Sequence, residues 1–519
     1  MHASTCLLYL QRTVWLGCLV AACGGIAALG APKNILLIIA DDYGADSSSL
    51  YNSTATGATF PPTPNITALA QSGMVFAQAY ANPLCSPTRA CLLTGRHSFR
   101  TGVGYAFGGA GSTPLAASEF TLPEAFAAAG TGHHLAQFGK WHLAAGVNSP
   151  LTVGGWTNFS GSIQGAITSY TNWSKVVNGG QTLNYTNYAT SDVVDDAVAW
   201  INARGTNAWF TWVAFNAGHT PLHKPPAHLA PTYAALPGTT PHINNNPELY
   251  FHAMIEAMDT EIGRLLAAVN LAETHVIFIG DNGTTVQTIQ PPAPTSHSKG
   301  SLYQGGIKVP LVIAGPGVTT PGTTNLTPVH AVDLFATILE LAGTNTGVVP
   351  AGVTIDSRSF ASTLGGSPDR ARRIYTEIFD TNPLSVADGR ALQDTRWKLI
   401  RFDDGHDEFY DLQTDPNENT NLLSSALTTE QQQYRERLQF QLYGYSTNSG
   451  PHIATAMWQG GQFSCAVTPP ANYALWRCED LTTTFWTPVS NAVATTNGTI
   501  VTLTDVAPPA GRAFYSVVK

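Results

Sequence analysis

Residues 34–44 read NILLIIADDYG, an apolar run that ends in two aspartates. An uncharged run of this kind predicts a strand that is buried on both faces, as strands of parallel sheets are. Asp41 and Asp42 would then lie at the carboxyl end of this strand. Ligands bind at that edge of open α/β sheets, so the stretch predicts a fold class together with the position of a site.

Two later segments repeat the pattern of an apolar run followed by polar residues. Residues 208–215 precede His219, and residues 275–279 precede Asp281 and Asn282. Helical patterns alternate with such runs through most of the chain. This alternation predicts an α/β fold with a large, mostly parallel central sheet flanked by helices.

A helix and a strand are expected after the first polar turn. Thr63 is a suitable N-cap, Pro64 suits the first helical position, and Gly73 would end the helix. Residues 75–80 then have the composition of a strand. The segment that begins at Cys85 would therefore follow a strand.

The character of the sequence changes past residue 365. Strand patterns over 373–379 and 391–402, followed by a helical pattern over 428–442, predict a small antiparallel sheet with one helix. Residues 446–450 form a polar linker, and the remainder is turn-rich and β-like. We therefore expect a signal peptide over 1–31, a large α/β domain over 32–365, an α+β subdomain over 366–447 and an accessory β module over 448–519.

Composition excludes several classes of protein. The 519 residues are 44% hydrophobic and 11% charged, which is typical of a globular chain with a sizeable core. A net charge of −9 argues against a general affinity for nucleic acid or anionic lipid. A local basic pocket could still bind an anion.

The N-terminus resembles an export signal. Arg12 precedes an apolar run over 14–22 that is too short to span a bilayer, and small residues follow. Cleavage after Ala31 would give a secreted or periplasmic protein. Residues 20–23 also resemble a bacterial lipobox, so a lipid anchor on Cys23 is the alternative. No later stretch predicts a transmembrane span in the mature chain.

The cysteines outside this leader are few: Cys85, Cys91, Cys465 and Cys478. The last two could form a disulfide in an oxidising compartment. Cys85 and Cys91 lack the spacing and the nearby histidines of a zinc site.

Residues 85–96 read CSPTRACLLTGR. Ser86 is expected to cap a helix that starts at Pro87, and the amino end of a helix favours anions. An isolated Cys-x-Pro triplet would more often be a buried thiol before an ordinary capped helix. Here the whole segment resembles the signature of type I sulfatases, where the cysteine is oxidised to formylglycine. Thr88 stands where that family more often has serine.

The resemblance continues in the family's order from about residue 33 to about residue 425. It rests on Asp41-Asp42, residues 139–143 (GKWHL), residues 216–221 (NAGHTP), residues 281–283 (DNG), residues 299–310 (KGSLYQGGIKVP) and residues 409–412 (FYDL). It implies a fold like that of alkaline phosphatase. Two positions depart from the pattern: Gln304 replaces a glutamate and Lys308 an arginine, which puts the positioning of Lys299 in question.

The resemblance also implies a metal site. Its ligands would be Asp41, Asp42, Asp281 and Asn282, with Cys85 in its oxidised form. Hard oxygen donors suit calcium or magnesium and suit zinc or copper poorly. Calcium is preferred over magnesium because a roomy, carboxylate-rich site that also takes a sulfate oxygen fits its higher coordination number.

Roles for the remaining residues follow from the same resemblance. A hydroxyl of the formylglycine hydrate made from Cys85 attacks sulfur, Arg89 stabilises the hydrate, and His142 is the base that expels sulfate. Lys140 and Lys299 hold the sulfate, and His219 and Lys299 assist the departing alkoxide. A formylglycine-generating maturation enzyme is thus an expected partner, with a sulfated small molecule or glycan as substrate.

Two other functions remain open at this point. Formylglycine enzymes of the same superfamily also hydrolyse phosphodiesters and phosphonates. With Cys85 unmodified, the chain could instead be a non-catalytic protein that binds sulfated glycans. The loops over 105–114 and 160–183 are expected to contact substrate, but their sequence does not identify it.

Overall fold

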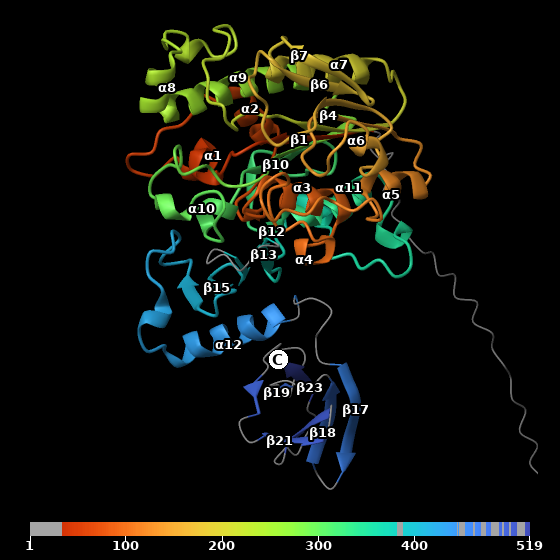
Figure 1. Cartoon of the computed structure of the whole chain (residues 1–519), viewed down its shortest axis with the longest axis vertical. Coiled ribbons are helices and arrows are strands. Elements are labelled where there is room, and N and C mark those ends of the chain that lie inside the picture. Colours follow the sequence, from red (N-terminus) through yellow and green to blue (C-terminus); the bar gives the residue numbers. More distant parts are fainter. Residues whose placement is uncertain are drawn as a thin grey trace, which may run out of the picture. The chain divides into compact units, whose positions relative to one another are not determined.

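The computed structural model places β1 (Asn34–Ala40) in the middle of a ten-stranded sheet (Figure 1). From one edge to the other, the strands are β11 (Thr323–Asn325), β2 (Gly73–Phe76), β10 (Leu311–Ala314), β9 (Thr274–Gly280), β1, β8 (Trp209–Ala214), β4 (His134–Lys140), β5 (Phe159–Ser162), β6 (Trp173–Val177) and β7 (Gly180–Tyr185). The structure describes residues 34–380, 388–443 and 445 and, between 452 and 518, seven strands and Val489.

The centre of the sheet is parallel. Each strand from β9 through β1, β8 and β4 to β5 pairs in parallel with the next. Antiparallel pairs occur on both sides of this centre, between β9 and β10 and between β5 and β6. The expected α/β class with a mostly parallel sheet is confirmed, in a sheet that is mixed towards its edges.

β1 is apolar throughout because both of its faces are covered. Ile35, Leu37 and Ile39 belong to one buried cluster, and Leu36, Ile38 and Ala40 belong to another. Successive side chains of a strand point to opposite faces, so the two clusters lie on the two sides of the sheet. A strand covered on both sides needs no alternation of polar residues.

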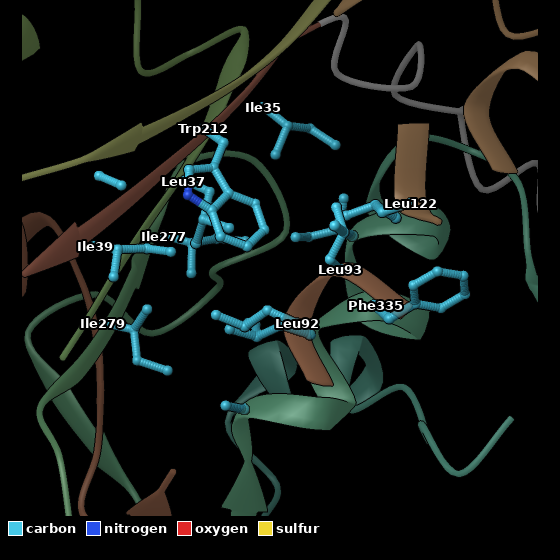
Figure 2. Packing of buried hydrophobic residues seen from close by; sticks show 14 of the residues in the cluster. Ile35, Leu37, Ile39, Leu92, Leu93, Leu122, Trp212, Ile277, Ile279 and Phe335 are labelled. Carbon is cyan, nitrogen blue, oxygen red and sulfur yellow. The ribbon is translucent and has the colours of Figure 1, made fainter. Parts of the chain in front are cut away.

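Helices form a layer on each face of the sheet (Figure 1). One layer contains α2 (Pro64–Ser72), α7 (Ala189–Asn202) and α9 (Pro247–Ala267). The other contains α3 (Cys85–Thr94), α5 (Leu122–Ala128) and α11 (Leu334–Leu341). Figure 2 shows Leu92 and Leu93 of α3 in the cluster formed with Leu37 and Ile277 of the sheet. Burial of each such side chain stabilises the fold by about 1.5–3 kcal/mol, so this packing holds α3 against the sheet.

The segment between β1 and α3 contains one correct prediction and one error. α2 begins at Pro64 with Thr63 as N-cap residue and ends before Gly73, as expected, although the Thr63 side chain makes no capping bond. The single strand expected over 75–80 is wrong, because a turn divides it into β2 and β3 (Ala79–Tyr80). β3 pairs with β12 (Val329–His330) in a separate two-stranded sheet.

A second sheet follows the α/β part and is antiparallel. Its strands are β13 (Ile374–Ile378), β14 (Gly389–Gln393), β15 (Trp397–Phe402) and β16 (Asp407–Asp411). The helix α12 (Thr429–Tyr443) packs on it through Leu438 and Leu442. The expected sheet with one helix is confirmed, but the strand expected over 391–402 is two strands. Asp394 makes the turn between them, accepting the backbone N–H groups of Arg396 and Trp397.

Short helices also occur in the α/β part of the chain: α1 (Ser49–Asn52), α4 (Ser98–Thr101), α6 (Ser149–Thr152), α8 (Thr240–Asn245) and α10 (Gln304–Ile307). Among the described residues, no helix has the length and apolar character that crossing a membrane requires.

The C-terminal segment is β-rich, as expected. It contains β17 (His452–Gln459), β18 (Gln462–Thr468), β19 (Ala474–Cys478), β20 (Thr487–Pro488), β21 (Ala492–Asn497), β22 (Ile500–Asp505) and β23 (Phe514–Val518). The predicted signal peptide with Cys23, the linker over 446–450 and the side chains of Cys465 and Cys478 lie outside what the structure describes. The division of the chain at residues 365 and 447 stays a prediction.

Candidate active site

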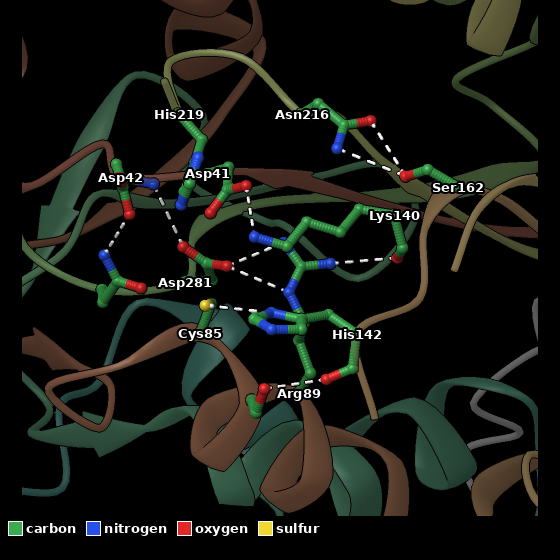
Figure 3. A network of polar contacts seen from close by, with 12 residues as sticks. Asp41, Asp42, Cys85, Arg89, Lys140, His142, Ser162, Asn216, His219 and Asp281 are labelled. Carbon is green, nitrogen blue, oxygen red and sulfur yellow. Dashed lines mark hydrogen bonds and ion pairs between the residues drawn. The ribbon is translucent and has the colours of Figure 1, made fainter. Parts of the chain in front are cut away.

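Two pairs of polar residues meet at the carboxyl edge of the parallel strands. Asp41 and Asp42 follow β1, and Asp281 and Asn282 follow β9. β1 and β9 are neighbours, with Ala40 opposite Gly280, so the two pairs lie side by side. The Asp42 N–H donates to Asp281 Oδ1 at 3.2 Å, and Asn282 Nδ2 donates to Asp42 Oδ1 at 2.8 Å. All of these side chains are buried (Figure 3).

The oxygen atoms of this group fit a divalent cation. Asp41 Oδ1 and Asn282 Oδ1 are buried without a hydrogen-bond partner among the described residues. Asp41, Cys85 and Asp281 each offer a ligand atom, and the three atoms lie within 4.8 Å of one another. Burial raises the pKa of Asp41 and of Asp281. A cation at this point would favour the ionised carboxylates, and hard oxygen donors suit calcium or magnesium.

Cys85 is the first residue of α3. The residue before it, Leu84, is extended, so the thiol lies at the amino end of a ten-residue helix. Its Sγ lies 3.2 Å from His142 Nδ1, and the residue is 1% exposed. The positive end of the helix dipole therefore faces the same space as the carboxylates, where it favours an anionic ligand.

Ser86 does not cap the helix as expected. The helix starts two residues before the predicted position, and no side chain makes a capping bond there. Ser86 Oγ instead donates to the carbonyl of His142 at 2.8 Å and accepts the N–H of Phe107 at 2.9 Å. The hydroxyl thus joins α3 to two loops that border the site.

Thr88, which precedes Arg89 in α3, hydrogen-bonds through its side chain to the backbone of the preceding loop. Its Oγ1 accepts the N–H of Asn82 at 3.0 Å and lies 3.1 Å from the carbonyl of Leu84. A hydroxyl is what these bonds require, and threonine supplies it as serine would. The departure from the family pattern at this position is therefore accommodated.

Arg89 connects the helix to the strand ends. Its Nε and Nη2 both donate to Asp281 Oδ2, at 3.0 and 2.7 Å, and its Nη1 donates to the carbonyl of Lys140 at 3.1 Å. Neither Arg89 nor Asp281 is exposed. Breaking a buried pair of this kind typically costs about 3–5 kcal/mol, so the contact fixes the position of α3 relative to β9.

Two lysines bring positive charge to the aspartates of β1. Lys140, at the end of β4, lies 2.6 Å from Asp41 Oδ2, and Lys299 lies 2.5 Å from Asp42 Oδ1. Burial raises the pKa of Asp42, but the ammonium group of Lys299 outweighs this and holds the pKa below its usual range. Asp42 in turn outweighs the effect of burial on Lys299 and raises the pKa of that amine. Lys299 is thus an ammonium ion at neutral pH.

His142 has its two ring nitrogens in different roles. Nε2 lies 2.8 Å from the carbonyl of Phe107, which can only accept, so Nε2 carries the proton. In the neutral ring Nδ1 is then an acceptor, and it faces Cys85 Sγ. Burial, with a contribution from Lys140, lowers the pKa of His142 to about 3. The ring is therefore a neutral base directed at residue 85.

His219 lies in the loop after β8. Its Nδ1 is 2.9 Å from the carbonyl of Thr220, which leaves Nε2 as the free acceptor of the neutral ring. Burial and the nearby Lys140 lower its pKa, although Asp42 acts in the other direction. His219 lies on the Asp42 side of the group, opposite His142 (Figure 3).

Tyr170 holds the loop that carries His219. Its hydroxyl lies 2.5 Å from the carbonyl of Asn216 and 2.8 Å from the carbonyl of His219. The ring is 2% exposed and stacks on His223, with the ring centres 4.2 Å apart. One phenol therefore contacts the backbone on both sides of the turn that positions His219.

The loop that carries Lys299 keeps its place despite the substitutions at Gln304 and Lys308. The N–H of Lys299 donates to the carbonyl of Thr284 at 2.8 Å, next to the Asp281 turn. Gln304 Nε2 donates to Gln393 Oε1 at 2.8 Å, and its N–H donates to Glu418 Oε2 at 2.5 Å. Gln304 thus connects this loop to the second sheet, and burial lowers the pKa of the Lys308 amine.

The structure brings every predicted site residue into this one group: Asp41, Asp42, Cys85, Arg89, Lys140, His142, His219, Asp281, Asn282 and Lys299. The sequence did not indicate Tyr170 or the carbonyl of Phe107. Tyr170 lies between β5 and β6. The segment over 160–183 was expected to be a loop, but it contains β6 and parts of β5 and β7, and no sequence pattern in it singles out one side chain. A backbone carbonyl has no sequence signal of its own.

Comparison with known proteins is consistent with this geometry. The family described as Sulfatase matches residues 33–344, and the family described as N-sulphoglucosamine sulphohydrolase, C-terminal, matches residues 296–447. A protein of Formosa agariphila named Sulfatase is 29% identical over 480 residues, which cover 75% of this chain and 84% of that relative. The N-acetylgalactosamine-6-sulfatase of Sus scrofa is 27% identical over 368 residues, which cover 64% of this chain and 66% of the relative.

Solved structures share the fold. The crystal structure of Ps i-CgsB superimposes with a TM-score of 0.67 at 22% identity, covering 80% of this chain and 93% of that one. At this level of identity the likeness concerns the arrangement of the elements.

Proposed function

Since the chain belongs to the sulfatase family, we propose that it hydrolyses sulfate monoesters at the site built around Cys85. One observation carries the proposal. The buried Sγ atom of Cys85 lies 3.2 Å from His142 Nδ1. It also lies within 4.8 Å of an oxygen atom of Asp41 and of an oxygen atom of Asp281. A nucleophile, a base and metal ligands would thus all act on one point.

Calcium is the proposed metal, with magnesium less suitable. Its ligands would be Asp41, Asp42, Asp281, Asn282 and the oxidised residue 85. Calcium accepts six to eight oxygen ligands, which leaves room for a sulfate oxygen beside these side chains. When bound, the ion would neutralise charge on the sulfate oxygens and favour ionisation of a hydroxyl on residue 85.

Cys85 is proposed to act after oxidation to formylglycine, whose hydrate supplies a hydroxyl nucleophile in place of the thiol. This step requires a maturation enzyme as a partner. Cys85 is 1% exposed and Arg89 is 0% exposed in the folded chain. The maturation enzyme would therefore have to act on the segment before the chain folds.

Cations are proposed to bind the sulfate. Lys140 and Lys299 would hold its oxygens, and Arg89 would stabilise the oxidised residue 85. Lys140 is fully buried, whereas the side chain of Lys299 is 15% exposed, so Lys299 is the one nearer to solvent and to an entering ester. Preorganised charges of this kind favour a transition state in which negative charge develops.

His142 is the proposed base for release of sulfate. Its Nδ1 faces residue 85 and its Nε2 is held by Phe107, so a proton taken from residue 85 would reside on Nδ1. A pKa of about 3 keeps the ring unprotonated before substrate binds. A bound sulfate would raise that pKa by bringing negative charge close to the ring.

Lys299 is the proposed proton donor to the leaving alkoxide. It is an ammonium ion beside Asp42, whereas the lowered pKa of His219 keeps that ring neutral with Nε2 as an acceptor. His219 would therefore position the ester by a hydrogen bond.

The proposed substrate class is a sulfated sugar or an aryl sulfate. The relative from Sus scrofa is named for the 6-sulfate of N-acetylgalactosamine, which favours a sugar. Export to the periplasm or the medium, or a lipid anchor on Cys23, would place the protein where such polymers occur.

Turnover of an aryl sulfate tests the proposal. We expect Cys85→Ala to reduce kcat by about 10³-fold or more, because the nucleophile is lost. Cys91→Ala removes the other buried thiol of α3 and should keep the rate within about twofold, because Cys91 touches Asn82 and not the site. Near-normal turnover by Cys85→Ala would overturn the proposal. Faster turnover of an aryl phosphate than of the aryl sulfate would favour a phosphate ester or phosphonate hydrolase.

A further inference from the structure

A pocket of about 340 Å³ lies at the end of α3 that is remote from Cys85. Its walls include His97, Arg358, Arg372, Arg373 and Tyr445. α3 has ten residues and is therefore roughly 15 Å long, and His97 follows its carboxyl end. The pocket is thus separate from the site around Cys85.

The two carboxylates that line the pocket are each already in an ion pair with another arginine. Asp333 pairs with Arg372 at 2.8 Å and also accepts the N–H groups of His330 and Arg358. Asp356 pairs with Arg100 at 2.8 Å and accepts the N–H of His97. Neither acid is left to balance another arginine.

Arg358 and Arg373 form no ion pair with either of these acids. In the part of the chain that the structure describes, neither guanidinium forms an ion pair, and Arg373 Nε is buried with no hydrogen-bond partner. Burial and the nearby Arg437 lower the pKa of Arg373, while the more weakly acting Asp394 raises it. Residues 446–451, which follow Tyr445 of the pocket wall, contain no aspartate or glutamate, and neither do residues 381–387 between β13 and β14. A partly buried cation that forms no ion pair is costly, so the pocket favours an anion.

His97 adds a neutral donor to this pocket. The residue is 5% exposed and its Nδ1 is buried without a partner among the described residues. Burial and Arg100 lower its pKa to about 3, so the ring is neutral and carries one N–H. Guanidinium groups and a neutral N–H together match the oxygens of a tetrahedral oxyanion.

We propose that this pocket is a second oxyanion site, which binds a sulfate group through Arg358, Arg373 and His97. The volume exceeds that of a sulfate ion, so a sulfate ester on a sugar can enter as well as free sulfate. The pocket is formed jointly by His97 after α3, Arg373 before β13 and Tyr445 after α12, so the anion would join the α/β part to the second sheet.

Calorimetric titration with sodium sulfate, at constant ionic strength, tests the proposal. The titration uses the Lys299→Ala chain, in which a lysine proposed to hold sulfate at the catalytic site is absent. This chain should bind sulfate, and adding Arg358→Ala and Arg373→Ala should weaken binding by about tenfold or more. Arg204→Ala removes a charge elsewhere on the surface and should leave the affinity unchanged within about twofold.

The same titration can overturn the proposal. Equal affinity with and without the two arginines would do so, and so would no binding to Lys299→Ala with both arginines present. Should Arg373→Ala impair folding, Arg358→Gln alone changes an exposed side chain and should still weaken binding measurably. Galactose 6-sulfate as a second titrant separates the two sources: tighter binding than free sulfate assigns the site to an ester group, and weaker binding assigns it to the free ion.

Catalysis distinguishes this proposal from that of the main site. With Lys299 intact, Arg358→Ala/Arg373→Ala should turn over an aryl sulfate within about twofold of the unmodified chain at low sulfate. The titration can therefore overturn the second site while the proposed sulfatase activity stands. Absence of turnover would likewise overturn the sulfatase activity without affecting the second site.

Discussion

At the level of single residues, orientation decides what each side chain can do. His142 faces Cys85 with Nδ1 because Nε2 is bound to the carbonyl of Phe107, and His219 leaves Nε2 free because Nδ1 is bound to the carbonyl of Thr220. Two backbone carbonyls thus set two tautomers. The chemical difference proposed for the histidines follows from these contacts, since both rings are neutral at pH 7.

Tyr170→Phe tests whether the His219 turn needs its phenol. The change removes one hydroxyl and keeps the ring stacked on His223, so the fold should persist. A lost hydrogen bond is worth about 1 kcal/mol, so we expect kcat/KM for an aryl sulfate to fall by roughly fivefold to tenfold. Tyr188→Phe is the matched control, because its hydroxyl bonds to His223 and touches neither carbonyl. An equal loss in both variants would show that Tyr170 acts through stability alone.

At the level of elements, the sequence predicted strands better than the turns between them. β1 and β9 are long apolar runs, and the pattern of these runs was enough to place their polar ends at one edge of a sheet. The strand expected over 391–402 failed because Asp394 bonds to two backbone N–H groups and forms a turn within the run. Likewise, serine is a residue type typical of an N-cap, but the Ser86 hydroxyl bonds to the backbone of His142 and Phe107. These contacts form only when distant segments of the chain pack together.

β9 also carries a buried histidine near the end opposite to the site. His275 is 2% exposed, and burial alone lowers its pKa to about 4. The unfolded chain, with a histidine pKa near 6.5, binds more protons between pH 4 and 6.5. The contribution of neutral His275 to the free energy of unfolding is therefore complete above pH 6.5 and is lost as the pH falls towards 4.

His275→Leu tests this pH dependence. The difference in unfolding free energy between pH 7 and pH 4 should shrink by about 3 kcal/mol, because the variant has no ring to protonate on unfolding. Urea unfolding at several pH values measures it. The other buried histidines keep some acid sensitivity in the variant, whereas an unchanged pH dependence would contradict the argument.

At the level of the whole molecule, the site joins the ends of two strands to α3 and to the second sheet. β1 and β9 supply the carboxylates, α3 supplies Cys85 and Arg89, and the loop at Lys299 connects to the second sheet through Gln304. A cation held by these elements would bind the folded chain and not the unfolded one. Its affinity would then appear as global stability.

Removal of the proposed metal should lower the stability of the entire protein. A chelator is expected to reduce Tm and aryl sulfate turnover, and calcium should restore both more fully than magnesium. At a free concentration of one hundred times Kd, calcium would add about 2.7 kcal/mol to the unfolding free energy. In Asp41→Asn, the chelator and added calcium should each change Tm and turnover little. A Tm that a chelator leaves unchanged would contradict calcium binding at Asp41, Asp42, Asp281 and Asn282.

The mass of the peptide that contains residue 85, isolated from catalytically active protein, tests the central claim most directly. Oxidation of the thiol to the aldehyde of formylglycine predicts a loss of about 18 Da relative to the mass calculated from the sequence. A peptide of unchanged mass, with a free thiol at Cys85 in a preparation that turns over aryl sulfate at its full rate, would contradict the claim.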